Sequence, residues 1–128
     1  YADAVHTSYE IVECRERASG ALRGVAVWTK SDFLFPGAGQ LVDWLCPVDD
    51  DAAMTSLVAE CERITNERGC PVLATLFPQM NPRFLKFQAM GFMVYGTTYF
   101  LVVIPFDNRG TLFYREQWYH TSGDSDLV

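Results

Sequence analysis

The stretch of residues 40–69 constrains the fold most, because it joins a buried strand to a long amphipathic helix. Residues 40–46 are too apolar for an exposed edge strand, and Pro47 ends the run because proline cannot donate to a sheet ladder. The segment that follows has apolar side chains at helical spacing, namely Ala53, Met54, Leu57, Val58, Cys61 and Ile64. We therefore predict a central strand that leads directly into a helix with one buried face.

Both ends of this helix carry recognisable signals. Asp49 or Asp50 is expected to cap the first amides, and Asp51 complements the positive end of the helix dipole. Gly69 can adopt the left-handed conformation that ends a helix. The sequence thus predicts a helix over residues 53–68.

The segments on either side predict further strands. Residues 9–17 alternate with period two and residues 22–29 form an apolar run, so that the turn residues between them predict an antiparallel hairpin. Gly24 interrupts the second strand, which predicts either a bulge or the close approach of another backbone. The apolar run 71–77 predicts a buried strand parallel to the central one, which completes a βαβ unit.

The carboxy-terminal part continues this pattern. Asn81 before Pro82 predicts the capped start of a short helix over residues 83–90. Residues 92–104 predict a long strand and residues 111–119 a last antiparallel strand. The expected fold is α/β (α+β) in a single domain, 1–128. It has a mixed, mostly antiparallel sheet, a long helix after the central strand and a short helix before the C-terminal strands.

Composition limits the classes of function. A chain of 128 residues that is 49% hydrophobic can bury one sizeable core. A net charge of −6 and a pI near 4.7 argue against a nucleic-acid or anionic-membrane surface. The apolar run 99–106 is too short to span a membrane, and no signal sequence is visible. The 4 cysteines form no CxxC pair, which predicts reduced core thiols, no metal site and a cytoplasmic location.

The order hairpin, strand, helix, strand, short helix, strand over residues 9–104 resembles the C-terminal two-thirds of a domain of the GCN5-related N-acetyltransferase (GNAT) superfamily. Residues 41–47 before the long helix resemble the central strand and cofactor helix of that family. Asn81 followed by Gly91 and Phe92 resembles its segment of Asn, short helix and Gly-Phe. The resemblance implies acyl-CoA-dependent transfer of an acyl group to an amine on a small molecule or a peptide.

The family's first strand and first two helices have no counterpart in this chain, which begins at Tyr1 and is expected to be a fragment or a processed domain. Without those helices, one face of the hairpin is expected to expose apolar side chains. Such patches invite partners, so we expect a homodimer or contact with a missing N-terminal segment, through this region or through the aromatic segment 111–119.

The resemblance also assigns cofactor-binding positions. It implies that acetyl-CoA or another acyl-CoA contacts the strand at Trp44, Leu45 and Cys46, the helix start at Ala52 and Ala53, and the cap residue Asn81. The family's diphosphate loop carries Arg or Gln and glycines, whereas residues 49–53 hold three aspartates and two alanines. Two interpretations stay open: the helix amides remain free to bind a diphosphate, or the carboxylates cap the helix and bind no ligand.

The catalytic candidates are Asp43 and Tyr95. Asp43 lies on the central strand, where the family often keeps a general base, although a structural hydrogen bond explains it equally well. The family's general acid is a tyrosine four residues before the Gly-Phe pair, and Phe87 stands there without a proton to donate. Tyr95, Tyr99 or Cys46 would have to replace it.

Two functions follow from these residues. The first is an acyl-CoA-dependent N-acyltransferase in which Asp43 deprotonates the amine and the amides of Trp44 and Leu45 polarise the acyl carbonyl. The alternative is a non-catalytic module with the same fold, which serves as a partner half, an oligomerisation domain or a ligand-binding domain. The acidic loop and Phe87 favour the second.

Overall fold

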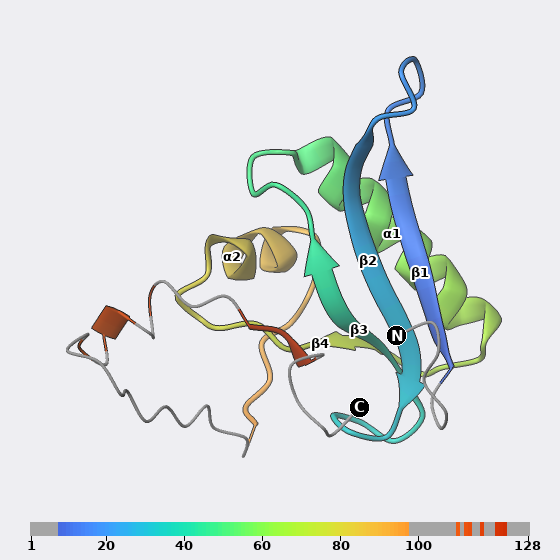
Figure 1. Cartoon of the computed structure of the whole chain (residues 1–128). Coiled ribbons are helices and arrows are strands. Elements are labelled where there is room, and N and C mark those ends of the chain that lie inside the picture. The colour runs from blue at the N-terminus through green and yellow to red at the C-terminus, as the bar shows by residue number, and fades with distance from the viewer. Residues whose placement is uncertain (1–7, 98–109, 111, 114–115, 117–119, 123–128) are drawn as a thin grey trace. The chain divides into compact units, whose positions relative to one another are not determined.

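The computed structural model describes residues 8–97, 110, 112–113, 116 and 120–122, and the chain divides into two compact units. The first unit comprises residues 1–76 and 121–128 and contains the sheet and the long helix (Figure 1). The second unit comprises residues 77–120 and contains the short helix.

The first unit is built on a four-stranded sheet with the strand order β1-β2-β3-β4 (Figure 1). The strands are β1 (Tyr9–Arg15), β2 (Leu22–Ser31), β3 (Ala38–Leu45) and β4 (Leu73–Thr75). β1 and β2 pair antiparallel, as do β2 and β3, whereas β3 and β4 pair parallel. The predicted hairpin and the predicted parallel strands are thus confirmed, and the sheet is mixed and mostly antiparallel.

Helix α1 (Asp51–Glu67) covers one face of this sheet and contacts all four strands (Figure 1). Its buried side chains are those with helical spacing in the sequence: Ala53, Met54, Leu57, Val58, Cys61, Ile64 and Thr65. Asp50 is the N-cap, and Gly69 follows the helix with a φ of +64°. The predicted helix and both of its end signals are therefore confirmed.

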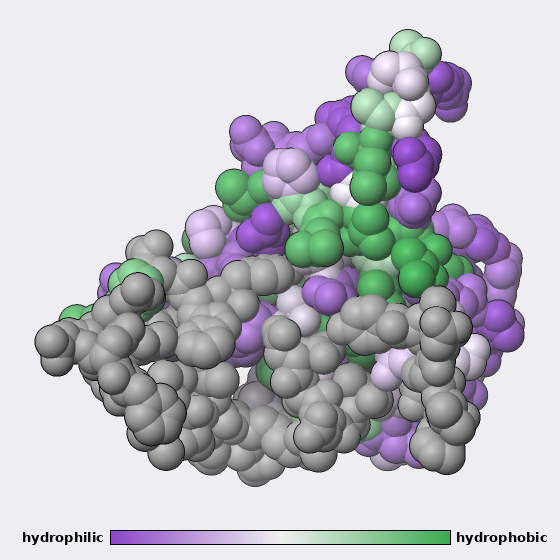
Figure 2. Space-filling model, viewed as in Figure 1, coloured by the Kyte–Doolittle hydropathy of each residue, from purple (hydrophilic) through white to green (hydrophobic). Residues whose placement is uncertain are grey.

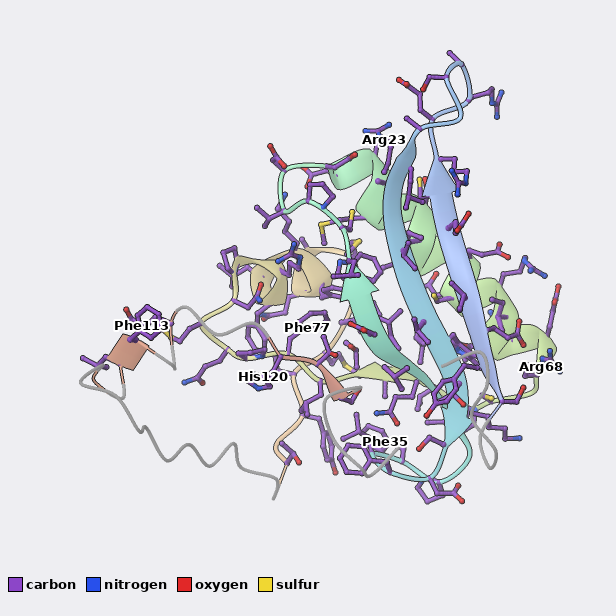
Figure 3. The ribbon with its side chains drawn as sticks, in the orientation of Figure 1. Arg23, Phe35, Arg68, Phe77, Phe113 and His120 are labelled. Atoms are coloured by element: carbon purple, nitrogen blue, oxygen red, sulfur yellow. The ribbon has the colours of Figure 1, made fainter. Side chains whose placement is uncertain are left out.

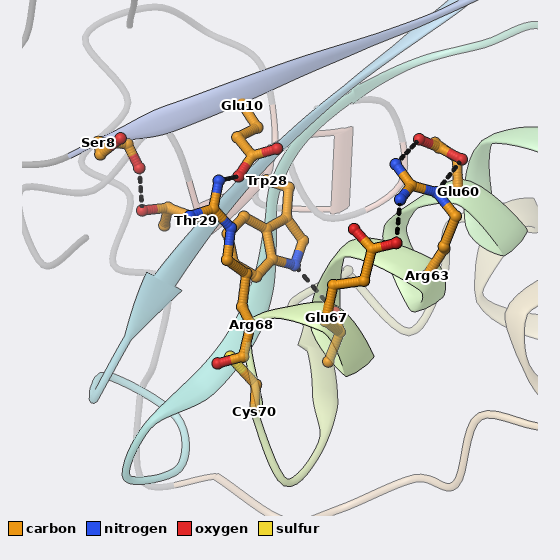
Figure 4. Close-up of polar contacts among 10 residues, drawn as sticks. Ser8, Glu10, Trp28, Thr29, Glu60, Arg63, Glu67, Arg68 and Cys70 are labelled. Atoms are coloured by element: carbon orange, nitrogen blue, oxygen red, sulfur yellow. Dashed lines mark hydrogen bonds and ion pairs between the residues drawn. The ribbon is translucent and has the colours of Figure 1, made fainter.

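The interface between α1 and the sheet is closely packed. The indole Nε1 of Trp28 donates to the hydroxyl oxygen of Thr65 at 2.9 Å, and both residues are buried (Figure 4). A Cβ atom added at Gly39 would lie 2.5 Å from that same oxygen and 2.8 Å from the indole nitrogen. One added at Gly24 would lie 3.0 Å from the side chain of Leu57. Both glycines therefore make room for side chains on this face.

Two bulges decide which side chains face α1. Between β1 and β2, Cys14 pairs with Gly24 and Arg15 with Leu22, so Arg23 is the extra residue. The bulge predicted near Gly24 is confirmed. Between β2 and β3, Trp28 pairs with Leu41 and Val27 with Asp43. Val42 is therefore the extra residue there, and the alternation of side chains along β3 changes phase at this point.

The consequence of the second bulge is that Gln40, Asp43 and Leu45 share the sheet face opposite α1, which we name the open face. Their partners on β2, in the same order, are Thr29, Val27 and Val25. Leu41 and Trp44 share the α1 face instead, and each is 1% exposed. A strand with uninterrupted alternation would place Asp43 beside Leu41 and Leu45, so the bulge is what brings Asp43 onto the same face as Gln40.

The open face exposes apolar side chains on β1, β2 and β3. Ile11 and Leu22 are each 52% exposed, and Leu45 is 64% exposed. Figure 2 shows hydrophobic side chains gathered along β2 and next to it. The expected exposed apolar patch on the hairpin is present. Within the described ranges, no helix has both the length and the apolar character that crossing a bilayer requires.

The second unit contains helix α2 (Pro82–Ala89), which begins after the cap Asn81 as predicted. Asn81 Oδ1 accepts from the amide of Arg83 at 3.0 Å. Phe87 is buried, and its ring centroid lies 4.9 Å from that of Phe77 and 5.0 Å from that of Phe92. These three rings form a small aromatic core for this unit.

Two predicted strands are wrong where the structure describes them. Residues 92–97 are not in a strand, and the remainder of the predicted strand 92–104 lies outside the described residues. Leu112, Phe113 and Glu116 are helical, and the amide of Phe113 donates to the carbonyl of Gly110 in a tight turn. β-branched and aromatic residues favour strands through packing on a neighbouring surface, and Met93, Val94 and Tyr95 are exposed instead.

Candidate functional site

The bulge in β3 places the most promising polar group, Asp43, on the open face. Its side chain is half-buried, and Oδ1 accepts from the amide of Trp44 at 2.7 Å. The hydroxyl of Thr121 also donates to Oδ1, at 3.3 Å. A carboxylate held by two donors has a fixed orientation, which a general base requires.

Thr121 and Ser122, which contact the bulge, were missed by sequence reasoning. Ser122 is fully buried, and its hydroxyl lies 3.4 Å from the carbonyl oxygen of Leu41 and 3.5 Å from that of Val42. Both residues belong to the same unit as the sheet. A Thr-Ser pair in a polar tail has no periodicity and matches no motif, so the sequence carries no signal that could have found them.

Gln40 lies on the same face as Asp43. It is 0% exposed. Among the residues that the structure describes, neither its amide nitrogen nor its amide oxygen has a hydrogen-bond partner. By contrast, the buried hydroxyl of Thr29, its neighbour on β2, donates to the carbonyl of Ser8 at 2.8 Å (Figure 4).

β3 separates from β4 next to these residues. Parallel pairing covers only Gly39, Gln40 and Leu41 on β3, and it ends before Val42. The hydroxyl of Thr75, the last residue of β4, donates to the carbonyl of Leu41 at 3.2 Å. β4 therefore does not pair with residues 42–45, and Thr121 and Ser122 contact β3 at Asp43, Leu41 and Val42.

The start of α1, the predicted diphosphate position, is occupied by its own cap. Asp50 Oδ1 accepts from the amide of Ala53 at 3.0 Å, and the carbonyl of Asp50 accepts from Met54. Arg23 donates to both carboxylate oxygens, at 2.8 and 2.5 Å, and lies next to the start of the helix (Figure 3). The Ala53 amide, followed by Arg23, lowers the pKa of the Asp50 carboxyl.

This arrangement matches the interpretation in which the carboxylates of the acidic loop cap the helix and bind no ligand. An anion that approached Ala53 would have to displace Asp50 from its amide and from Arg23. Ala52 is exposed in the first turn, while Ala53 is buried against the sheet. A diphosphate group therefore does not fit here as long as Asp50 caps the helix.

Leu45 and Cys46, the other predicted cofactor-binding residues of this segment, lie on opposite sides of the sheet and differ in exposure. The side chain of Leu45 is exposed on the open face, whereas Cys46 is 4% exposed and lies near Gly24 on the α1 side. The 4 cysteines are all free. Burial raises the pKa of the Cys61 thiol to about 12, which suits a core residue and not a nucleophile.

The predicted site residues fall into both units. The first unit contains Asp43, Trp44, Leu45 and Cys46 on one strand, and Ala52 and Ala53 at the start of α1. The second contains Asn81 and Tyr95. Asn81 serves as a helix cap, and Tyr95 is 76% exposed in a segment without regular structure.

A groove of about 580 Å³ between β1 and α1 is a separate hollow in the first unit. Its charged side chains pair within the chain: Glu10 with Arg68, and Arg63 with both Glu60 and Glu67 (Figure 4). No group of three or more His, Cys, Asp or Glu side chains suited to a metal ion occurs among the described residues.

Comparison with protein-family models gave no match, and comparisons with curated proteins and with solved structures gave no significant match.

Proposed function

We propose that this chain is an acyltransferase domain of GNAT type that transfers an acyl group from a thioester to an amine. The observation that carries the proposal is the bulge at Val42, which turns Asp43 onto the open face next to the point where the pairing of β3 with β4 ends. β-bulges often re-aim a side chain next to an active site. The order of strands and helices in the first unit also supports it.

In this proposal Asp43 is the general base. It accepts a proton from the acceptor amine while the nitrogen attacks the acyl carbonyl, and the C–S bond then breaks to release the thiol. The Trp44 amide at present donates to Asp43, so it orients the base in addition to lying next to the expected position of the carbonyl. The leaving thiolate takes a proton from solvent.

The acyl donor in this proposal binds mainly through its thioester end. In this proposal an extended acyl-thiol arm lies along β3 beyond Leu41, where the pairing with β4 ends. The start of α1 does not offer free amides to a diphosphate, because Asp50 and Arg23 occupy it. Coenzyme A alone is therefore expected to bind weakly.

A second candidate function is a non-catalytic module that acts as the partner half of an acyltransferase or as a ligand-binding domain. Two observations favour it. The capped start of α1 leaves no place for a diphosphate, and Phe87 is packed between two aromatic rings at the position of the family's acid. The exposed patch around Ile11, Leu22 and Leu45 would then be its interface, in a homodimer or with another segment.

Acyl transfer can be tested with acetyl-CoA and a panel of amines, with release of free thiol as the signal. The proposal predicts turnover by the unaltered chain and a loss of about 100-fold in Asp43→Asn, because general bases typically contribute 10²–10⁴-fold. Asp49→Asn, which removes a nearby exposed carboxylate, is the matched control and should retain full activity.

Equal rates in Asp43→Asn and the unaltered chain would show that Asp43 is not the base. An absence of turnover with every amine, together with no calorimetric heat on titration with acetyl-CoA, would favour the non-catalytic module.

A further inference from the structure

β1 forms one edge of the sheet in the first unit, and its outer side has no strand partner among the described residues (Figure 1). The groove of about 580 Å³ lies between this edge and α1, and every residue of β1 from 10 to 15 lines it. Val12 and Cys14 are only half-buried, although their neighbours on β2, Ala26 and Gly24, are buried. An edge strand that borders a groove can accept one more strand by β-addition.

The charged side chains of β1 are matched by opposite charges of the same chain. Glu10 pairs with Arg68, and Glu13 pairs with Arg15 on the same strand. Unmatched like charges on an edge strand repel a second strand, and natural proteins use them to keep edges unpaired. Because both carboxylates of β1 have a guanidinium partner, this edge carries no net charge that would exclude another copy.

The sequence of β1 fits an antiparallel copy of itself. A twofold axis at Val12 pairs all 7 residues of the strand with those of the other copy. The opposed positions are Tyr9 with Arg15, Glu10 with Cys14, Ile11 with Glu13, and Val12 with itself. No like charges lie directly opposite each other in this register. A shift of the axis to Glu13 would oppose two carboxylates, and a shift to Ile11 would pair fewer residues.

The same axis brings the grooves of the two copies together, because both grooves lie on the face of the sheet that α1 covers. Each groove has apolar walls in Leu57 and Ile64 of α1, which are 1% and 5% exposed, and in the half-buried Val12. Pairing about the axis removes the exposed part of Val12 from water in both copies. A twofold contact uses the same edge of both copies, so the assembly closes at two.

We propose that two copies of this chain pair antiparallel through β1 and join their four-stranded sheets into one. The interface is the edge of the sheet with the groove beside it, and it is distinct from the exposed patch of the open face around Leu22 and Leu45. The pairing requires neither acyl transfer nor a ligand, so it stands or fails independently of the proposed function.

Sedimentation of the unaltered chain from micromolar to millimolar concentration tests the association, and we expect a species of twice the 14.5 kDa of the chain. Val12→Lys places two like charges opposite each other at the axis and should sediment as a monomer. Leu45→Lys, at a 64% exposed position on the open face, is the matched control and should remain a dimer. A monomer at every concentration, or a dimer that Leu45→Lys dissolves and Val12→Lys does not, would overturn the proposal.

Cysteine cross-linking tests the register, and it does not depend on the folding of the lysine variant. Val12→Cys and Ile11→Cys are each made in a Cys14→Ser background, in which the remaining cysteines are buried. Oxidised glutathione takes up the two electrons of each new disulfide. In the proposed register the Cα atoms of the two copies of residue 12 lie about 4.5–5.5 Å apart, which a disulfide can span, and those of residue 11 lie about 8 Å apart, which it cannot.

The exposure of the two positions makes this comparison stringent. Ile11 is 52% exposed and Val12 is half-buried, so random collisions between monomers would favour Ile11→Cys. We expect about tenfold more disulfide-linked dimer in Val12→Cys than in Ile11→Cys. Equal yields, or a higher yield in Ile11→Cys, would overturn the proposal.

Discussion

Two buried polar side chains, Thr65 on the α1 side of the sheet and Gln40 on the open face, differ in their hydrogen bonds. On the α1 face, the buried Trp28 indole and Thr65 hydroxyl bond to each other, and the glycines leave room for this contact. On the open face, Gln40 is equally buried and has no partner among the described residues, while Ile11 and Leu45 are exposed. The contrast is thus between one buried polar contact that is satisfied, Trp28 with Thr65, and one buried amide that no described residue satisfies.

This difference predicts opposite effects on the free energy of unfolding when the two kinds of buried polar group are removed. A satisfied buried polar group stabilises the fold modestly, and its removal leaves its partner unpaired. An unsatisfied one destabilises the fold, so its removal should have the opposite effect. Substitutions on the two faces should therefore change the free energy of unfolding with opposite signs, which provides a direct test of the comparison.

Gly39→Ala should give the largest loss of stability. The new Cβ would lie within 3.0 Å of Thr65 and of the Trp28 indole, so that neither the backbone nor the hydrogen bond could remain in place. Overpacking of this kind costs about 3 kcal/mol in the free energy of unfolding. Denaturant titration of Gly39→Ala measures the loss.

Gly96→Ala is the matched control for that substitution, because a Cβ at Gly96 meets nothing within 4 Å. Its free energy of unfolding should stay within about 0.5 kcal/mol of the unaltered value. Similar losses in both variants would mean that the contact around Gly39 is not tight.

Thr65→Val should destabilise the α1 face by about 2 kcal/mol, because it leaves the buried Trp28 indole without its acceptor. The valine also removes the donation from the Thr65 hydroxyl to the Cys61 carbonyl at 2.7 Å. Thr65→Ser keeps the hydroxyl and should recover most of the loss. Thermal unfolding of the two variants compares them directly, and equal stabilities would show that the hydroxyl has no role.

The sequence could predict the α1 face well, because that face depends on local signals. Helical spacing identified Met54, Leu57 and Cys61, and the cap residues fixed both helix ends. The parallel pairing of β3 and β4 followed from a strand, helix, strand connection of ordinary length.

The residues of the open face could not be predicted, because they depend on the register in which β3 pairs with β2. The extra residue, Val42, shifts by one the alternation of side chains between the two faces of β3. No residue in that apolar strand is typical of a bulge. Asp43 was identified as a candidate by its charge in an apolar run, but its neighbours Gln40 and Thr121 were not. The strands predicted over residues 92–104 and 111–119 are wrong at residues 92–97 and at Leu112, Phe113 and Glu116 for a related reason, since β propensity alone does not supply a neighbouring strand.

Gln40→Leu should raise the free energy of unfolding by about 1 kcal/mol, in contrast to both substitutions on the α1 face, because it removes an unsatisfied buried amide. Gln40→Glu keeps the size but buries a carboxyl group, so it should lower stability instead. Chemical denaturation of both variants in the absence of any ligand is the measurement. A loss of stability in Gln40→Leu would indicate that the amide is satisfied in solution.

The smallest effect should come from Asp50, a satisfied group at the solvent-facing start of α1. The Ala53 amide and Arg23 lower the pKa of this carboxyl below its usual value of 3.8. Its stabilising contribution is therefore fully present above that value and is lost as the pH falls through the lower, folded-state pKa. Melting temperature measured from pH 6 to pH 2 should fall less steeply in Asp50→Ser, which can still cap the helix, than in the unaltered chain. The slope should be unchanged in Asp49→Asn, because no shift of the Asp50 pKa depends on Asp49. Superimposable curves for Asp50→Ser and the unaltered chain would mean that the ion pair with Arg23 is fully screened by solvent.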